Sequence, residues 1–153
     1  GNAYSHGLKA SLAGLKQVAT AEKSGDGQTL SEDPAFQAKI AEAEIAISAL
    51  EFTELRILSS LSTGKNVGPE SSLLKCRGSE LQQNLTELYC EAVGNYAAPF
   101  DNSGPVKGLN VEPIGPEYAA VAAPAYFNTR KVSIYAGSNE IQRNIMAKAV
   151  LGL

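Results

Sequence analysis

The feature that most constrains the fold is a helical pattern about thirty residues long in the first half of the chain. Asp33 can cap its start, and Pro34 suits the first helical position, where the missing N–H costs nothing. The pattern ends near Thr63 and Gly64. Its apolar residues recur every three or four positions, at Phe36, Ile40, Ala43, Ile47, Leu50, Ile57 and Leu61. Because such a stripe is buried most readily against other long helices, the sequence predicts a helical bundle.

Helical signals continue on both sides of this element, and none of the other segments is typical of a strand. The predicted helices are Asn2 to Ala21, Pro69 to about Gly94, Pro124 to Ala136, and a short C-terminal helix from Ser138. Val132–Tyr135 contains β-prone residues but is too short for a strand and is framed by helix signals. We therefore expect an all-α, up-down four-helix bundle with an additional short C-terminal helix, forming one domain over residues 1–153.

Composition excludes several classes of function. A chain of 153 residues with 44% hydrophobic and 19% charged residues is typical of a globular domain with a real core. The net charge of -3 gives no reason to expect nucleic acid or an anionic membrane surface as a partner. No apolar run approaches the roughly 20 residues that a membrane-spanning helix needs. We expect neither nucleic-acid nor membrane binding.

The two cysteines and the single histidine indicate neither a disulfide nor a metal site. Cys76 and Cys90 lie on one predicted helix, about 21 Å apart at about 1.5 Å per residue, which is too far for a disulfide. Two thiols of this kind fit a reducing, cytoplasmic compartment. His6 has no nearby Cys or second His, so we expect a surface residue, with no metal site and no Ser-His-Asp triad.

Some charged and small residues stand at unusual helical positions. Glu54 falls close to the apolar stripe, and we expect a partly buried structural ion pair there rather than a catalytic carboxylate. Lys75 and Arg77, near the start of the third helix, oppose its dipole. We expect them to be solvated, the alternatives being contact with a phosphate or a neighbouring subunit. Gly78 in mid-helix costs about 1 kcal/mol relative to Ala, which indicates close helix packing.

The last two helices are predicted to meet at a corner made of small residues. Gly137 stops the fourth helix, because glycine reaches a positive φ without strain. Ser138 can cap the next helix, Glu140 lies in its positive first turn, Lys148 lies in its last turn and Gly152 follows it. Free amides at such a helix start suit a polar ligand group. The alternative is an ordinary helix–helix corner without a ligand.

A longer signature surrounds this corner. Ser133–Leu153 reads SIYAGSNEIQRNIMAKAVLGL and resembles the C-terminal signature of the acyl-CoA dehydrogenase family. Pro69–Lys75, Thr86–Leu88 and Tyr126–Lys131 resemble the bacterial branch that includes the large subunit of pimeloyl-CoA dehydrogenase. The resemblance covers essentially the whole chain but only the C-terminal helical domain of the family. It implies a piece of a longer protein that lacks its N-terminal helical and β-domains and is inactive alone.

The resemblance also implies a reaction, a cofactor and partners. The reaction is the FAD-dependent α,β-dehydrogenation of an acyl-CoA thioester in fatty acid metabolism, with electron-transferring flavoprotein or a similar protein as acceptor, in a homo- or hetero-oligomer. Ser138 then offers its hydroxyl or amide to the flavin nucleotide, and Glu140 reaches the ribose or adenine side. Tyr135 and Gly137 line the acyl pocket, where the glycine keeps space for the cofactor and substrate.

The expected catalytic base is missing from the corner. Many relatives place a Glu immediately before the Gly, where this chain has Ala136, and a methyl group cannot take a proton. We therefore expect no catalytic residue in this chain, and a base upstream of Gly1 or on a catalytic partner. Ala136, together with Cys90 in place of a Gln that often binds FAD in the family, also permits a non-catalytic subunit that contributes assembly and part of the flavin site. A helical interaction module unrelated to flavin is the third alternative.

Overall fold

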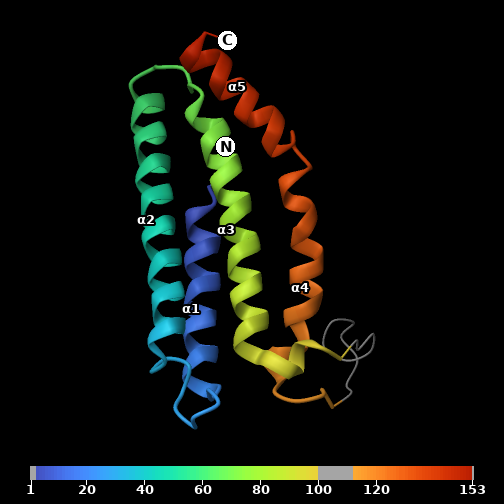
Figure 1. The fold of residues 1–153 in the computed structure, drawn as a ribbon. Helices are drawn as coiled ribbons and strands as arrows, with labels where there is room; N and C mark the ends of the chain where they lie inside the picture. Colours follow the sequence, from blue (N-terminus) through green and yellow to red (C-terminus); the bar gives the residue numbers. More distant parts are fainter. Residues whose placement is uncertain (1–2, 100–111, 153) are drawn as a thin grey trace.

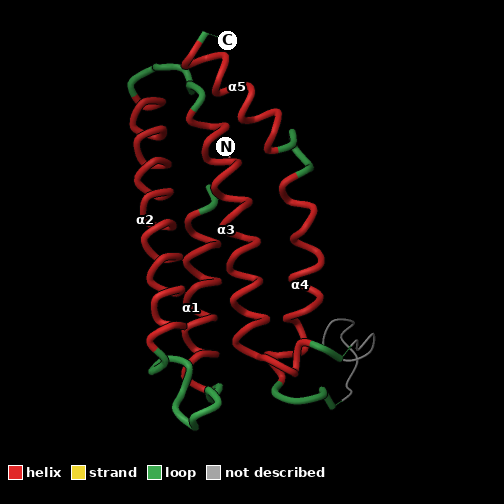
Figure 2. The backbone as a smooth tube through the Cα atoms, in the orientation of Figure 1, coloured by secondary structure: helices red, strands yellow, loops and turns green. Residues whose placement is uncertain are grey.

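The computed structural model describes residues 3–99 and 112–152, and all elements in this part of the chain are helical. Its α-helices are α1 (Ser5–Ala21), α2 (Pro34–Ser62), α3 (Glu70–Val93), α4 (Ala122–Thr129) and α5 (Asn139–Leu151). Short 3-10 helices are η1 (Gly94–Ala97), η3 (Glu117–Val121) and η4 (Arg130–Ser133). α3 is central and contacts each of the other four α-helices (Figure 1). The predicted all-α fold is confirmed, since the described backbone consists of helices and loops (Figure 2). The only β-type pairing among the described residues is an isolated bridge between Lys23 and Thr29.

The signals at the start of α2 act as predicted. Asp33 Oδ1 accepts a hydrogen bond from the Ala35 amide at 3.1 Å, and Pro34 is the first helical residue. The helix then runs for 29 residues, to Ser62. α1 begins at Ser5, and the predicted start at Asn2 lies outside the described residues.

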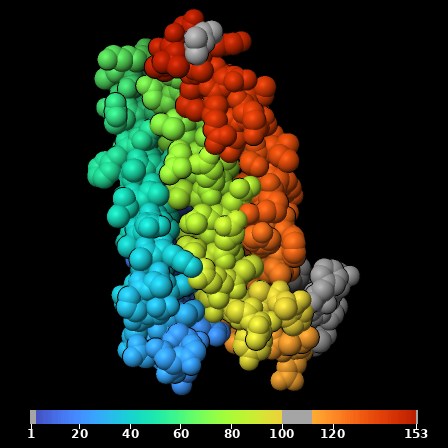
Figure 3. Space-filling view, viewed as in Figure 1, coloured from blue at the N-terminus to red at the C-terminus, as the bar shows by residue number. Residues whose placement is uncertain are grey.

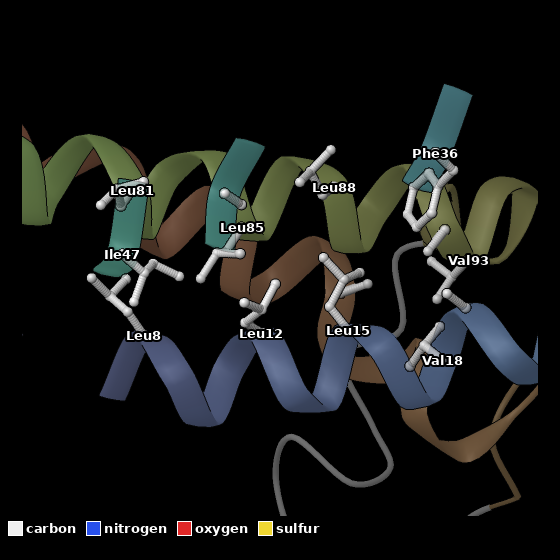
Figure 4. Close-up of a cluster of buried hydrophobic side chains, with 14 of the residues drawn as sticks. Leu8, Leu12, Leu15, Val18, Phe36, Ile47, Leu81, Leu85, Leu88 and Val93 are labelled. Carbon is white, nitrogen blue, oxygen red and sulfur yellow. The ribbon is translucent and has the colours of Figure 1, made fainter. Parts of the chain in front are cut away.

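The core forms where the stripes of the three long helices meet. Leucines and a valine of α1 point toward apolar side chains of α2 and α3 (Figure 4). Each fully buried side chain of this size contributes about 1.5–3 kcal/mol. The labelled core residues are Leu8, Leu12, Leu15, Val18, Phe36, Ile47, Leu81, Leu85, Leu88 and Val93.

Gly78 allows the close packing that its position indicates. A Cβ atom built on Gly78 would lie 2.5 Å from Cγ of Tyr4, well inside van der Waals contact. The ring of Tyr4, just before α1, therefore lies directly on the backbone of α3. Packing of the Tyr4 ring against α3 offsets the loss of helix propensity that glycine causes at position 78.

Glu54 is buried as expected, but the predicted ion pair is wrong. Its carboxylate accepts hydrogen bonds from the amides of Tyr4 at 2.6 Å and Ser5 at 3.1 Å, and from the Ser5 hydroxyl. No cation lies within 4.0 Å of it among residues 3–99 and 112–152. α1 has no side-chain cap of its own, so its first amides lack acceptors. Glu54 supplies that acceptor from the middle of α2, at the positive end of the α1 dipole.

The fourth helix is shorter than predicted. α4 begins at Ala122, before Pro124, and gives way to η4 at Arg130 instead of continuing to Ala136. Gln83 on α3 donates to the carbonyl oxygens of Thr129 at 3.3 Å and Arg130 at 3.2 Å. These oxygens would otherwise accept from amides one turn later, so the contact with α3 favours the tighter 3-10 geometry.

Other expectations concern the loops and single residues. The predicted helical turn at residues 117–122 is present as η3, which leads directly into α4. The predicted loop over residues 97–116 falls largely outside the described residues. His6 is exposed, as expected, and both cysteines are free thiols.

No described helix is long and apolar enough to cross a membrane. Within residues 3–99 and 112–152 there is also no group of three or more His, Cys, Asp or Glu side chains that could hold a metal ion.

Candidate functional site

The corner before α5 is built by two consecutive residues with positive φ. Ala136 has φ 56° and Gly137 has φ 85°. A Cβ on Gly137 would lie 2.6 Å from Nε2 of Gln142, which donates to the Ala136 carbonyl oxygen at 3.4 Å. The backbone conformation therefore favours glycine at position 137, whereas Gln142 Nε2 is the end of a flexible side chain that can shift. Ala136 adopts the left-handed region at a cost of roughly 1–2 kcal/mol. We call residues 134–138 the elbow.

Ser138 starts α5 as the sequence predicts. Its Oγ accepts from the Ile141 amide at 3.5 Å, and Gly152 ends the helix in the left-handed conformation at φ 69°. Glu140 lies in the first turn and Lys148 in the last. Hydrogen bonding to its own backbone amide and to Ser138 lowers the pKa of Glu140. The elbow thus presents a helix N-terminus with a hydroxyl and an ionised carboxylate beside it.

A groove of about 540 Å³ lies between α1 and α4, with α3 as its floor. Tyr135 lines the end of the groove next to the elbow, and its side chain is half exposed. Gly137, Ser138 and Glu140 are close to it in the chain but are not part of its lining. The small residues Gly7, Ser11 and Gly14 on α1 make room for it. Its other lining residues are Leu8, Gln82, Leu85, Thr86, Tyr89, Val121, Ala122, Ala125, Asn128, Thr129 and Val132.

The described groove lining contains no charged side chain, and therefore no carboxylate that could act as a base. Ala136 presents only a methyl group at the elbow. The two thiols are poor nucleophiles, because burial raises the pKa of both Cys76 and Cys90. Among the described residues, the groove provides apolar surface with hydroxyl and amide groups at its edge.

The expectation that Lys75 is solvated is wrong. Its side chain is buried, and Nζ donates to Asn139 Oδ1 at 2.8 Å and to the Ser133 carbonyl oxygen at 3.2 Å. Asn139 Nδ2 in turn donates to Ser79 Oγ at 3.0 Å. The physical reason is that Lys75 lies on the side of α3 that α5 covers, where backbone and amide oxygens replace water. Arg77 is exposed as expected and pairs with Glu80 at 2.8 Å.

Lys75 is the first member of a polar row on α3 that the sequence analysis missed. Ser79, Gln83 and Thr86 follow it at helical spacing, and each contacts the segment from Thr129 to Asn139. In the space-filling view, α4 and α5 lie along one side of α3 (Figure 3). The signal was present as a second stripe at three-and-four spacing, made of polar residues beside the apolar stripe.

Arg130 fastens the end of α4 to the same side of α3. Its guanidinium lies 4.2 Å from the ring centroid of Tyr126, pairs with Glu87 at 2.7 Å and donates to the Gln83 carbonyl oxygen at 3.0 Å. Stacking of this kind contributes about 0.5–1 kcal/mol at exposed sites. The segment that leads into the elbow is therefore attached to α3 by several contacts of Arg130.

Comparison with protein families now identifies the domain. Residues 11–151 match the model of the acyl-CoA dehydrogenase C-terminal domain. The chain belongs to the acyl-CoA dehydrogenase family. The match runs from Ser11 in α1 to the end of α5, and it includes the elbow and all of the groove lining except Gly7 and Leu8. A comparison with curated proteins finds no match.

Solved structures share the fold of this acyl-CoA dehydrogenase domain at low sequence identity. One is a chain of the ChsE4–ChsE5 complex from Mycobacterium tuberculosis, with TM-score 0.72 and 22% identity, covering 95% of this chain and 35% of that one. A structure of the electron transferring flavoprotein of Acidaminococcus fermentans has a TM-score of 0.71 and 18% identity, and the match covers 94% of this chain and 33% of that one. The FAD complex of PigA has a TM-score of 0.73 and 17% identity, and the match covers 98% of this chain and 34% of that one. This chain thus spans about a third of the length of these relatives.

Proposed function

We propose that this chain is the C-terminal part of an FAD-dependent acyl-CoA dehydrogenase that oxidises the α,β-bond of an acyl-CoA thioester. The family match over residues 11–151 supports this proposal most strongly. FAD would accept the hydride from the β-carbon when bound. Electron-transferring flavoprotein or a similar protein is the proposed acceptor, and the cytoplasm the proposed compartment. Placement beside the pimeloyl-CoA dehydrogenase large subunit stays a prediction.

The residues of the elbow fit a flavin nucleotide. Ser138 and the first amides of α5 are hydrogen-bond donors at the positive end of a helix, which suits a polar or anionic group. Gly137 has no side chain to obstruct a planar ring. We assign Ser138, Glu140 and Gly137 to FAD binding, and Tyr135 and Gly137 to the acyl pocket. The uncharged groove beside Tyr135 is suited to an acyl chain.

The proposed base lies outside this chain, either upstream of Gly1 or on a partner subunit. Its role is to remove the α-proton, and it must reach that proton directly or through one water. This chain's own residues bind and orient the cofactor and the acyl group.

A non-catalytic subunit of a hetero-oligomeric dehydrogenase is the second candidate. One observation favours it: Ala136 occupies the elbow position that carries a Glu in many family members, so this position presents no carboxylate. In this role the domain contributes assembly and part of the flavin site, while the base comes from a partner chain.

The full-length protein distinguishes these functions. An acyl-CoA dehydrogenase should purify yellow, and its flavin absorbance should bleach when an acyl-CoA is added without oxygen. A yellow protein that bleaches only after a partner chain is added would support the non-catalytic subunit. A full-length protein that stays colourless after incubation with FAD would overturn both.

A further inference from the structure

We propose that Lys75 is a positioning residue, which holds the elbow in the geometry that receives the flavin. This inference rests on the proposed function, because it assigns the elbow to FAD. It concerns a residue on α3 that lies outside the elbow and acts on it through Asn139 and the Ser133 carbonyl group.

The surroundings of Lys75 are unusual for an ammonium group. Its residue is 8% exposed, and no carboxylate of residues 3–99 and 112–152 lies within 4.0 Å of Nζ. A buried charge costs several kcal/mol unless hydrogen bonds satisfy it. A methionine would fill a similar volume without this penalty, so the ammonium does more than occupy space.

The two acceptors of Lys75 stand on opposite sides of the elbow. Ser133 is the last residue of η4, and Asn139 is the first residue of α5. One ammonium group therefore ties both ends of the five-residue elbow to α3. Because its three N–H donors are arranged tetrahedrally on a long stem, lysine reaches both oxygens at once.

Ser79 and Lys75 together fix the direction of the Asn139 amide. Asn139 Nδ2 donates to Ser79 Oγ at 3.0 Å, and the serine hydroxyl donates to the Cys76 carbonyl oxygen at 2.9 Å. The same hydroxyl lies 3.2 Å from Asn139 Oδ1, and Lys75, which can only donate, approaches that oxygen at 2.8 Å. Without the ammonium, the part-buried Ser133 carbonyl oxygen loses this donor, Asn139 Oδ1 keeps only the Ser79 hydroxyl at 3.2 Å, and the link across the elbow is lost.

Three of the charged groups around this site pair with one another. Glu80 on α3 pairs with Arg143 on α5 at 2.7 Å and also with Arg77. Glu140, in the first turn of α5, is exposed, and the charge of Lys75 is a minor cause of its lowered pKa. Lys75 is thus the buried cation that joins α3 to the elbow among the described residues.

The test compares FAD affinity in variants of the full-length protein, with thermal unfolding measured in parallel. Lys75→Met and Asn139→Leu should each weaken FAD binding by about tenfold, since each removes a hydrogen bond to a charged group. Asn139→Asp should stay close to wild type, because a carboxylate oxygen accepts from Lys75 in the same place. Lys65→Met, a matched loss of charge at an exposed lysine, should leave affinity unchanged. The Lys75→Met, Asn139→Leu double variant should be no weaker than the weaker single variant.

Several results would overturn this role. A folded Lys75→Met variant that binds FAD within about twofold of wild type would show that the ammonium only stabilises the fold. If Lys75→Met does not fold, the FAD affinities of Asn139→Leu and Asn139→Asp are compared instead. Equal affinity of these two variants would contradict the inference. Fully additive losses would mean that the two residues act separately. If wild-type protein binds no FAD at all, the proposed function fails, and this role fails with it.

Discussion

At the scale of single residues, the buried polar groups of this domain serve to join segments that are distant in the sequence. Glu54 of α2 holds the first amides of α1, and Lys75 of α3 holds the two ends of the elbow. Neither is paired with an opposite charge among the described residues. Hydrogen bonds offset the cost of burying each group. Glu54 accepts from the first backbone amides of α1, and Lys75 donates to oxygens at the two ends of the elbow.

Glu54→Ala should lower the free energy of unfolding of the 153-residue chain by about 1–3 kcal/mol, because it leaves buried donors without an acceptor. Glu51→Ala is the matched control, since Glu51 also reaches from α2 to α1 but pairs with Lys9 at the surface. It should cost less than about 1 kcal/mol. Urea unfolding of both variants measures the difference, and equal losses would contradict the capping role of Glu54.

Gly78→Ala should destabilise the chain, although alanine favours a helix by about 1 kcal/mol. The new methyl group would meet the Tyr4 ring, and overpacking of this kind typically costs about 1–3 kcal/mol. Gly7→Ala on α1 should instead stabilise it, since no atom lies within 4 Å of a Cβ built there. A rise in the urea midpoint for Gly78→Ala would show that Tyr4 moves away at little cost.

At the scale of elements, the end of α1 is joined to the start of η3 by a short polar link. Tyr118 Oη donates to Glu22 Oε1 at 2.6 Å, and Tyr89 Oη donates to the Tyr118 carbonyl oxygen at 3.1 Å. The hydrogen bond to Glu22, with burial as a smaller cause, raises the pKa of Tyr118 to about 12. The protonated phenol is therefore the form that the fold favours.

This link predicts a pH dependence of stability. An unfolded tyrosine has a pKa of about 10, so the stabilisation is complete below about pH 10 and is lost as the pH rises toward about 12. Wild-type stability should fall over this window, and Tyr118→Phe should reduce that fall. Denaturant unfolding across the window measures both. The same slope in both proteins would show that Tyr118 does not contribute to it.

Elements set by local sequence signals were predictable, whereas those set by contacts with another helix were not. The periodic stripe of α2 and the caps at Asp33 and Ser138 are local signals, and they predicted these helices well. The length of α4 depends on Gln83, which lies on another helix. The roles of Glu54 and Lys75 likewise depend on which oxygen or amide the facing helix supplies. Periodicity places a residue on a face but does not give the rotation of the neighbouring helix.

For the candidate site, the sequence predicted the backbone of the elbow but not the polar side chains of α3 that hold it. The small-residue corner, its cap and its flanking charges were predicted from local patterns and from the family resemblance. The row of polar residues on α3 was not, because a buried lysine with only neutral partners is uncommon.

At the scale of the whole molecule, several helices carry large apolar side chains on faces that no other described segment covers. On α2, the side chains of Ile45, Phe52 and Leu55 are exposed on the side away from the core. On α5, Ile141, Ile145 and Val150 are exposed, and Met146 is half buried. Apolar surface of this extent typically marks contact with another domain or chain.

The 153-residue chain should therefore self-associate at high concentration. Light scattering should give a mass above the 16.0 kDa of one chain. Phe52→Lys and Val150→Lys should lower that mass by placing a charge in the contact. Gln17→Lys, which adds the same charge at an exposed position of α1, should not change it. A monomer for the wild-type chain at high concentration would contradict this expectation.

The central claim is that the elbow receives the flavin, and a structure of the full-length protein with FAD bound tests it most directly. We expect the polar part of FAD to contact Ser138 and the first amides of α5, with Gly137 beside it and the acyl group in the groove next to Tyr135. FAD bound at a different place, or an elbow covered by bulky side chains of another domain, would contradict the claim.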